Sequence, residues 1–349
     1  MASIHVRTAN RPMRILIMTH LFAPSIGGIE TMSLLLARAF AAAGHEVRVV
    51  TATPSSDPAH DHGLTVLRRP APADLLKAAT WCDVCFHNNI SLAFAWPVLL
   101  LGKPWVVTSQ TWIARDDRSL GWREHLKRTL LRCAHSVAIS RAITRSLPVR
   151  SQLIPNCYDS DLFHAEPEQS AGRAGDLIFV GRLVSDKGAD LALEALQRLR
   201  KRGLSPNLTI IGDGPERAKL EAQVLSLNME TQVNFAGPKQ GEALASEFRR
   251  HRIQLVPSRW AEPFGVVALE GAACGCLVLG SQDGGLIDAI GPCGATFPNG
   301  DADGLADLIE RALSGGLSIC VGARDAHLQI HQPAAVAARY LDVFTFLQT

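Results

Sequence analysis

The stretch RILIMTHLFAPSIGGIETMSLLLARAFAAAGHEVRVVTA, residues 14–52, decides the fold. It opens with a short apolar run that is typical of a buried strand, and APSIGG breaks that run. From Met32 to Ala43 apolar residues recur at helical spacing, Gly44 ends the helix, and HEVRVVTA supplies a second strand. A strand–helix–strand order of this kind predicts a parallel sheet with helices on both faces.

The same pattern continues and then restarts further along the chain. In the first half, strands are expected at DVCFHN, PWVVTSQ, SVAIS and SQLIPN. After the polar stretch YDSDLFHAEPEQSAGRAGD, strands are expected at LIFVGRL, NLTIIGDG, QVNFAG, IQLVPS, CLVLGS and GATFP. We therefore predict an α/β protein of two Rossmann-like domains that face each other across a cleft, residues 1–155 and 156–333. The last helix, about 334–349, is a candidate to pack back on the first domain.

Length and charge agree with two domains and suggest an anionic partner. At 349 residues the chain exceeds one ordinary core. Up to Pro155 there are 18 Lys/Arg and 9 Asp/Glu, whereas the remainder holds 17 and 24, so the first half is expected to meet something anionic. No apolar run is long enough to span a bilayer, and the N-terminus does not resemble a secretory signal. We expect a cytoplasmic protein, with contact at the inner face of a membrane left open.

Cysteines and acidic pairs give no sign of a metal site. The pair Cys82 and Cys85 has no second pair at matching spacing, so buried, reduced thiols are expected for the eight cysteines. The DAD sequence at Asp301 to Asp303 precedes an amphipathic run and is interpreted as a helix cap. We expect no metal and no cofactor.

Candidate binding residues follow the strands, where ligands bind in open α/β sheets. In APSIGGIE, Gly27 and Gly28 allow backbone amides to approach an anion, although a plain turn is the alternative. The loop lacks the G-x-G-x-x-G order, which disfavours NAD. In VGRLVSDKG, Arg182 and Lys187 could clamp a diphosphate, or could be a solvated surface pair.

Two more turns complete this set. IGDGPER carries Asp213 in what could equally be a simple tight turn. In RWAEPFGVVALE the start of a helix, Phe264, Gly265, Val266 and Val267, offers amides to a phosphate. Glu270 lies about 7.5 Å further along that helix and suits a ribose diol, while Glu262 precedes the helix. Taken alone, such a pair of glutamates is usually surface chemistry.

Together GGIE, VGRLVSDKG, IGDGPER, VPSRWAEPFGVVALE and LIPNCYDSDLF resemble the retaining glycosyltransferases of family 4, which have the GT-B fold. The resemblance runs from about Arg14 to the C-terminus, and its most specific element is the E-x7-E pair. It implies a nucleoside-diphosphate sugar as donor, bound by the C-terminal half, and a glycan, glycolipid or small-molecule acceptor bound by the N-terminal half. Cell-envelope polysaccharide, glycolipid or glycoconjugate synthesis is the process it suggests.

The resemblance also implies roles for residues that match the family motifs. Gly28 would approach the diphosphate, Arg182 and Lys187 would hold its phosphates, and Glu270 would bind the ribose. Glu262 would lie near the transferred sugar, and NFAGP, which contains Phe235, would border the base.

One position departs from the family. Where a histidine is common this chain has Gln110, which can hydrogen-bond a sugar but cannot act as a base near neutral pH. Proton acceptance would then fall to the leaving phosphate, as in the same-face mechanism usually proposed for the family. His87 is a weaker substitute, with a structural or acceptor-contacting role preferred.

Two further questions stay open at this point. The basic stretch 115–150, with Arg123 and Lys127 on one side of an amphipathic helix, is either solvated or meets an anionic membrane surface or a lipid-diphosphate acceptor. The rival functions are a sugar-nucleotide epimerase of the same fold and a non-catalytic sugar-nucleotide-binding protein. The E-x7-E context and the intact Glu262, Arg182 and Lys187 weigh against both.

Overall fold

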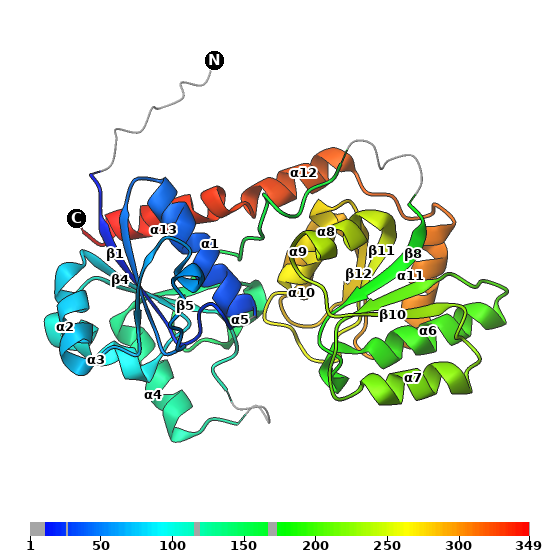
Figure 1. Ribbon diagram of the computed structural model, residues 1–349, viewed down its shortest axis with the longest axis horizontal. Helices are drawn as coiled ribbons and strands as arrows, with labels where there is room; N and C mark the ends of the chain where they lie inside the picture. The colour runs from blue at the N-terminus through cyan, green and yellow to red at the C-terminus, as the bar shows by residue number, and fades with distance from the viewer. Residues whose placement is uncertain (1–10, 26, 115–118, 167–172, 349) are drawn as a thin grey trace, which may run out of the picture. The chain divides into compact units, whose positions relative to one another are not determined.

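The computed structural model describes residues 11–25, 27–114, 119–166 and 173–348 (Figure 1). Contacts divide the chain into two units. The first contains Met1–Ala138, Ser146–Ile154 and Val336–Thr349, and the second contains Ile139–Arg145 and Pro155–Ala335. Each unit is an α/β structure built on a parallel sheet, which confirms the predicted fold class. Part of the basic stretch, residues 115–118, lies outside the described residues.

The first sheet has seven strands within the described residues, in the order β3-β2-β1-β4-β5-β6-β7. They are β1 Arg14–Thr19, β2 Glu46–Thr51, β3 Thr65–Arg68, β4 Val84–Asn88, β5 Trp105–Ser109, β6 His135–Ala138 and β7 Gln152–Leu153. The helical segments up to residue 155 are α1 Gly28–Ala42, η1 Pro58–Asp61, α2 Pro72–Trp81, α3 Leu92–Leu101, α4 Trp122–Leu130, η2 Leu131–Cys133 and α5 Arg141–Ser146. β3 was not predicted, because this edge strand is short and only half-buried.

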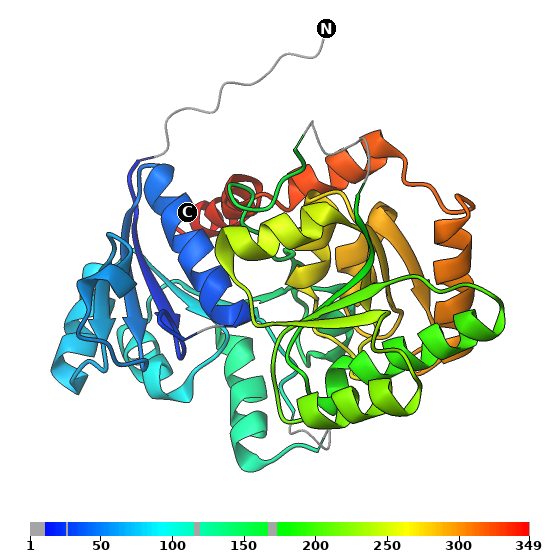
Figure 2. The same ribbon diagram turned by 45° about the vertical axis from the view of Figure 1, so that its right-hand side comes forward.

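Helices cover both faces of this sheet. Leu75 of α2 and Phe94 of α3 belong to the core on one face. On the other face α1 lies beside the C-terminal helix α13, Pro333–Phe346, as Figures 1 and 2 both show. Phe40 of α1 packs against Phe344 of α13, with ring centroids 5.4 Å apart. The hydroxyl groups of Tyr340 and Thr108 lie 2.9 Å apart, so α13 is also hydrogen-bonded to β5.

The second sheet has six strands within the described residues, in the order β10-β9-β8-β11-β12-β13. They are β8 Gly175–Val180, β9 Leu208–Ile211, β10 Val233–Gly237, β11 His251–Val256, β12 Leu277–Ser281 and β13 Gly294–Phe297. The helical segments are η4 Ser185–Lys187, α6 Ala189–Lys201, α7 Arg217–Ser226, α8 Gly241–Arg250, α9 Val266–Ala273, α10 Leu286–Ile290, η5 Gly291–Cys293, α11 Ala302–Leu313 and α12 Val321–Ile330. The core on one face joins α6, α7 and α11, and α8, α9 and α10 contact the sheet as well.

Strand order brings the candidate loops of the second unit to one edge. β9, β8, β11 and β12 are consecutive neighbours and run parallel, so the loops that follow them emerge at their carboxyl ends. This is the edge at which open α/β sheets bind ligands.

Other sequence expectations can be compared with the fold. All eight cysteines are free thiols, and six of them are buried as expected; Cys133 and Cys320 are exposed, which corrects the expectation for those two. Among the described residues, no helix combines the length and the apolar character that crossing a membrane would require.

Candidate functional site

The centre of the candidate site in the second unit is an ion pair between two loops. Nζ of Lys187, in the loop after β8, lies 2.5 Å from Oε1 of Glu262, in the loop after β11. The hydroxyl of Ser258 donates to the same carboxylate oxygen at 2.8 Å. The Glu262 residue is 7% exposed, whereas about a third of the Lys187 side chain, 32%, stays exposed. The cation therefore keeps an open side toward solvent while its carboxylate partner is held in place.

Close backbone approach brings these two loops together. Gly188 follows Lys187 at φ 70, and a Cβ there would lie 2.0 Å from the carbonyl oxygen of Pro257. The backbone amide of Arg259 donates to the carbonyl of Asp186 at 2.8 Å. On its other side the backbone of Glu262 forms a parallel bridge with Gly284. Only glycine fits both the positive φ and the contact at residue 188, so this residue fixes the lysine beside the glutamate.

Arg182 and Asp213 lie on the neighbouring turns and are both exposed. Within the described part of the chain, the Arg182 guanidinium has no ion pair or hydrogen bond, so it is available to an anion from solution. The Asp213 carboxylate accepts from the amide of Gly214 at 2.8 Å, and the Asp213 carbonyl accepts from the amide of Leu183 at 2.9 Å. Asp213 thus connects the turn after β8 to the turn after β9. These contacts are those of the simple tight turn that the sequence left open as an alternative.

The start of α9 has the geometry of an anion site. Gly265 is its N-cap residue at φ 101, in the left-handed region, and the helix begins at Val266. The first amides of a helix, here those of Val266 and Val267, have no acceptor within the helix and point along the positive end of its dipole. The side chain of Phe264 is 2% exposed and packs near the ring of His331, so this residue offers backbone only.

Glu270 lies one turn further along α9 and differs from Glu262 in its environment. Its carboxyl group has no hydrogen-bond or ion-pair partner among the described residues. Burial, together with the nearby carboxylate of Asp159, raises the pKa of Glu270 to about 7. A group of this kind can change protonation near neutral pH, and a bound diol would supply the hydrogen bonds that it lacks here.

The glycine turn of the first unit begins a helix as predicted. Gly27 is the N-cap of α1, and Gly28 is its first residue. A Cβ at Gly27 would lie 2.7 Å from a carboxylate oxygen of Glu30, whereas a Cβ at Gly28 would meet no atom within 4 Å. A side chain at Gly28 would therefore point into open space.

Gln110 and His87 are not surface groups. Gln110 follows β5, is 5% exposed and donates from Nε2 to Oδ1 of Asn88 at 2.8 Å. His87 is fully buried in β4, where its Nδ1 accepts from the indole N–H of Trp105 at 2.6 Å. Burial lowers the pKa of His87 to about 3, so the ring is neutral. Of the two roles expected for His87, structural or acceptor-contacting, these contacts fit the structural one, because every residue of β4 is buried.

Phe235 and Asp301 occupy the places expected from the sequence. Phe235 lies on β10, the edge strand of the second sheet, and packs partly buried against the core. Asp301 caps α11, since its carboxylate accepts from the amides of Asp303 at 3.1 Å and Gly304 at 2.9 Å. The cap interpretation of the DAD sequence is therefore confirmed.

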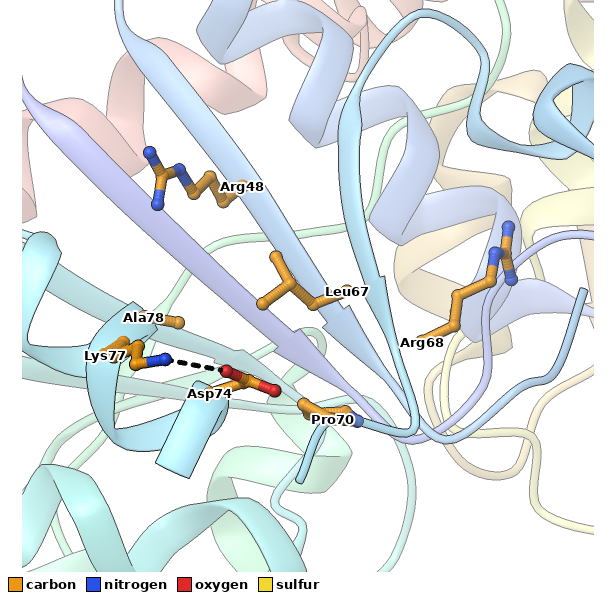
Figure 3. Close-up of a pocket in the computed structure, with 7 residues that line it drawn as sticks. All are labelled: Arg48, Leu67, Arg68, Pro70, Asp74, Lys77 and Ala78. Atoms are coloured by element: carbon orange, nitrogen blue, oxygen red, sulfur yellow. Dashed lines mark hydrogen bonds and ion pairs between the residues drawn. The ribbon is translucent and has the colours of Figure 1, made fainter. Parts of the chain in front are cut away.

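A hollow of about 340 Å³ in the first unit is lined by Arg48, Leu67, Arg68, Pro70, Asp74, Lys77 and Ala78 (Figure 3). Two of its three cations are paired with acids within the protein. Lys77 pairs with Asp74 at 3.2 Å, and the Arg48 guanidinium lies 3.9 Å from the centre of the Trp81 ring. Arg68 points away from the other two cations and pairs with Asp61 at 2.8 Å. Among the described residues Arg48 is thus the one lining cation without an acidic partner, and the hollow also contains the carboxylate of Asp74.

The structure brings some predicted residues together and separates others. Lys187 and Glu262 are in contact, and Arg182, Asp213 and the start of α9 follow neighbouring strands at the same sheet edge. Gly27, Gly28, Gln110 and His87 belong to the other unit. Sequence reasoning missed Ser258 and Asp159. Each lies within a stretch whose other residues were considered, but a lone serine or aspartate in a loop gave no distinguishing signal.

Two family models match consecutive parts of the chain. One, described as Glycosyltransferase Family 4, matches residues 26–162, and the other, Glycosyl transferases group 1, matches residues 163–320. Together they match parts of both units and every loop of the candidate site.

Individual relatives are more distant. The gpi3 subunit of phosphatidylinositol N-acetylglucosaminyltransferase from Schizosaccharomyces pombe is 25% identical over 224 residues, 62% of this chain and 49% of that protein. A D-inositol 3-phosphate glycosyltransferase from Acidothermus cellulolyticus is 32% identical over 189 residues, 49% of this chain and 42% of that protein. The chain therefore aligns with less than half the length of either curated relative.

Similar folds are found among solved structures. Anabaena Alr3699/HepE, crystallised in complex with UDP and glucose, matches with a TM-score of 0.78 at 19% identity, covering 96% of this chain and 100% of that one. At this identity the match establishes the shared two-domain fold alone.

Proposed function

The chain belongs to the glycosyltransferases whose two halves these family models describe, and from that premise we propose that it is a retaining hexosyltransferase using a nucleoside-diphosphate sugar. The acceptor is a hydroxyl group of a glycan, glycolipid or small molecule. The observation that carries the proposal is the Lys187–Glu262 pair at the carboxyl edge of the second sheet. The start of α9 follows a strand at the same edge, as does Arg182, which has no ion pair among the described residues.

The donor-binding roles follow from charge and geometry. The diphosphate binds at the start of α9 and between Lys187 and Arg182, whose charges stabilise the departing phosphate. Glu262 is held by Ser258 and accepts hydrogen bonds from hydroxyl groups of the transferred sugar. Glu270, further along the same helix, binds the ribose diol, and Phe235 and its neighbours border the base.

The chemical step needs no protein base. The bond between the anomeric carbon and the phosphate oxygen breaks, and the acceptor oxygen forms its bond on the same face of the sugar. The acceptor proton passes to the departing phosphate oxygen, so the products are the glycoside and the protonated nucleoside diphosphate. This route suits a chain with Gln110 where a base would stand and a neutral, buried His87 nearby.

The cationic groups also make a metal ion unnecessary. Lys187, Arg182 and the α9 amides supply positive charge where the diphosphate charge increases during transfer. We therefore propose that transfer is metal-independent.

The setting of the reaction is the synthesis of cell-envelope polysaccharide, glycolipid or glycoconjugate in the cytoplasm. The acceptor could be presented at the inner face of a membrane. The basic helix α4, with Trp122 67% and Leu126 41% exposed, has the side chains that favour an anionic membrane surface.

Donor screening followed by product analysis tests the proposal. UDP-, GDP- and ADP-sugars are compared by thermal shift, since a ligand that binds the native state raises its melting temperature. UDP-glucose is the first choice because a solved structure of the same fold holds UDP and glucose. We expect one donor to stabilise the protein and NMR to show a glycoside with the donor's anomeric configuration. An inverted product would reject the retaining mechanism, and no stabilisation by any donor would reject the donor site.

A further inference from the structure

A second cavity in the first unit, about 570 Å³ in volume, differs from the hollow of Figure 3 in the state of its charges. We call it the β4–α4 cavity, because the end of β4 and one side of α4 line it, together with residues that follow β1 and residues at the starts of α1 and α3. The residues are His20, Leu21, Ile29, Asn88, Asn89, Ile90, Ser91, Leu92, Ala93, Trp122, Arg123 and Lys127. None of them is acidic.

The floor of the β4–α4 cavity is fixed by a hydrogen-bonded network. Asn88 is fully buried, and its Nδ2 donates to the hydroxyl of Ser33 at 2.7 Å and to the carbonyl of Ile29 at 3.2 Å. Its Oδ1 accepts from Gln110. Every polar group of the Asn88 amide is therefore satisfied by the protein, and the floor is rigid. Gln110 acts here as a positioning residue beneath the cavity.

The wall on the α4 side carries two unmatched cations. Arg123 and Lys127 are four residues apart, so they lie on the same face of the helix. Within the described ranges neither side chain forms an ion pair or a hydrogen bond; the Arg123 guanidinium only lies over the neighbouring Trp122 ring, 5.2 Å from its centre. Lys77 in the other hollow, by contrast, is paired with Asp74. Two cations without acids favour an anionic ligand.

The opposite wall adds a buried polar group. Ser91, the residue before α3, is 7% exposed and lines the cavity. Its hydroxyl does not cap the helix, and it has no partner among the described residues. This hydroxyl lines the cavity and is free to donate a hydrogen bond to an acceptor atom of a ligand. The first amides of the ten-residue helix α3 lie beside it and prefer the same negative charge.

We propose that the β4–α4 cavity binds a phosphate group carried by the acceptor, with Arg123, Lys127 and Ser91 as its ligands and the exposed Trp122 ring against the attached ring or chain. This inference rests on the proposed function and names the acceptor class: a phosphorylated sugar or polyol, soluble or as a phospholipid headgroup. A phosphate matches two cations and a hydroxyl donor better than a neutral sugar does. The two curated relatives named above have phosphorylated or phosphatidyl inositol in their names.

The test compares phosphorylated probes with their neutral parents. Inositol 3-phosphate, glucose 1-phosphate and glucose 6-phosphate are titrated by phosphorus NMR, with inositol and glucose as competitors. Phosphatidylcholine vesicles with and without phosphatidylinositol are tested by sedimentation. We expect binding by at least one soluble phosphate or by the phosphatidylinositol vesicles, and which of the two arms binds distinguishes the source. Neutral parents should compete at least about tenfold more weakly.

The variants connect this binding to the cavity. Arg123→Ala/Lys127→Ala should weaken binding about tenfold or more, and Ser91→Ala should weaken it less. Lys77→Ala, which removes a cation from the other hollow, should have no effect. Wild-type protein that binds no phosphorylated probe, or a double variant that binds as tightly as wild type, overturns the inference. UDP-sugar binding, measured in the same variants, should be unchanged; its absence in wild type would instead count against the proposed function.

Discussion

Two lysines, one in each half of the molecule, differ in whether the protein itself supplies a carboxylate partner. Lys187 in the second unit is already paired with Glu262, a carboxylate that is 7% exposed and also held by Ser258. Lys127 in the first unit lines a cavity in which no residue is acidic. A cation with a fixed internal partner is positioned before any ligand arrives, whereas one without a partner relies on the ligand for its neutralisation. The first arrangement suits a reacting centre, and the second suits recognition.

This contrast has an energetic side. Removing Lys187 leaves the charge of Glu262, which is 7% exposed, without its cation. Because about a third of the lysine side chain is exposed to solvent, we expect a cost below the about 3–5 kcal/mol that is typical of a fully buried pair. Removing an exposed cation that has no partner costs the folded protein little. Substitutions in the second unit therefore need a check of folding, whereas those on α4 act mainly on ligands.

The largest expected effect comes from Glu262→Gln. This change keeps the size of the side chain but removes the charge that holds Lys187 and orients the sugar, so we expect kcat to fall about 10³-fold, the scale seen when one preorganised transition-state contact is lost. Steady-state transfer assays measure it, with circular dichroism as the check of folding. A variant that remains folded and retains more than about a tenth of wild-type kcat would remove Glu262 from the reacting centre.

The next effect concerns Glu270 and pH. Its pKa is raised to about 7, so ribose binding by the carboxylate should weaken up to about tenfold per unit as pH falls below 7. Glu270→Gln should bind donor weakly at every pH from 5.5 to about 8.5, with a flat profile. Calorimetric titration of the donor checks this, and a wild-type profile that is flat through pH 7 would contradict it.

The same carboxyl group also affects stability in the unliganded protein. Because its pKa is higher in the folded state than the ordinary 4.5, its contribution to stability is fully present below pH 4.5 and is lost as pH rises through about 7. Compared with wild type, Glu270→Gln should therefore become relatively more stable between those values. Urea unfolding at several pH values measures the difference.

A smaller effect is expected from salt, which should change the KM for the acceptor more than it changes kcat. Exposed charges are screened as the Debye length falls from about 10 Å at 0.1 M to about 3 Å at 1 M salt. The KM for a phosphorylated acceptor should rise several-fold over this range, whereas kcat, which depends on the partly buried Lys187–Glu262 pair, should change less. If KM and kcat depend equally on salt, then the cations of the two units do not differ in how strongly salt screens them.

The smallest expected effect is that of a chelator. If protein cations supply all the positive charge at the diphosphate, then EDTA should leave the transfer rate unchanged within error. Adding Mg²⁺ or Mn²⁺ back to EDTA-treated enzyme is the matched control. Loss of activity that Mg²⁺ or Mn²⁺ restores would mean that Lys187 and Arg182 are not sufficient.

The sequence was sufficient for the fold because alternation of buried strands and helices is a local signal. β1 and β8, for example, were found from uninterrupted apolar runs followed by glycine-containing turns. β3 was missed because an edge strand buries too little of its length to produce such a run. The sequence left a structural and an acceptor-contacting role open for His87, because in a parallel strand buried on both faces the position along the strand does not reveal that a polar residue faces the core.

The sequence predicted which residues belong to the candidate site better than it predicted which of them are in contact. Turn motifs named Lys187 and Glu262, but their direct pairing depends on a glycine at 188 that lets two backbones approach. The β4–α4 cavity was not predicted at all. The basic character of α4 was recognised, but Asn88 and Ser91 become significant only when β4 and α3 bring them beside that helix.

Titration of the protein with UDP, GDP and ADP, in wild type, Lys187→Ala and Lys77→Ala, tests most directly that the second unit holds a diphosphate on a prepositioned lysine. At least one of the three should bind wild type and Lys77→Ala equally, and bind Lys187→Ala about 10- to 100-fold more weakly, as expected for one charge-assisted contact. Equal affinity for wild type and for folded Lys187→Ala, or no binding of any diphosphate, would contradict the account.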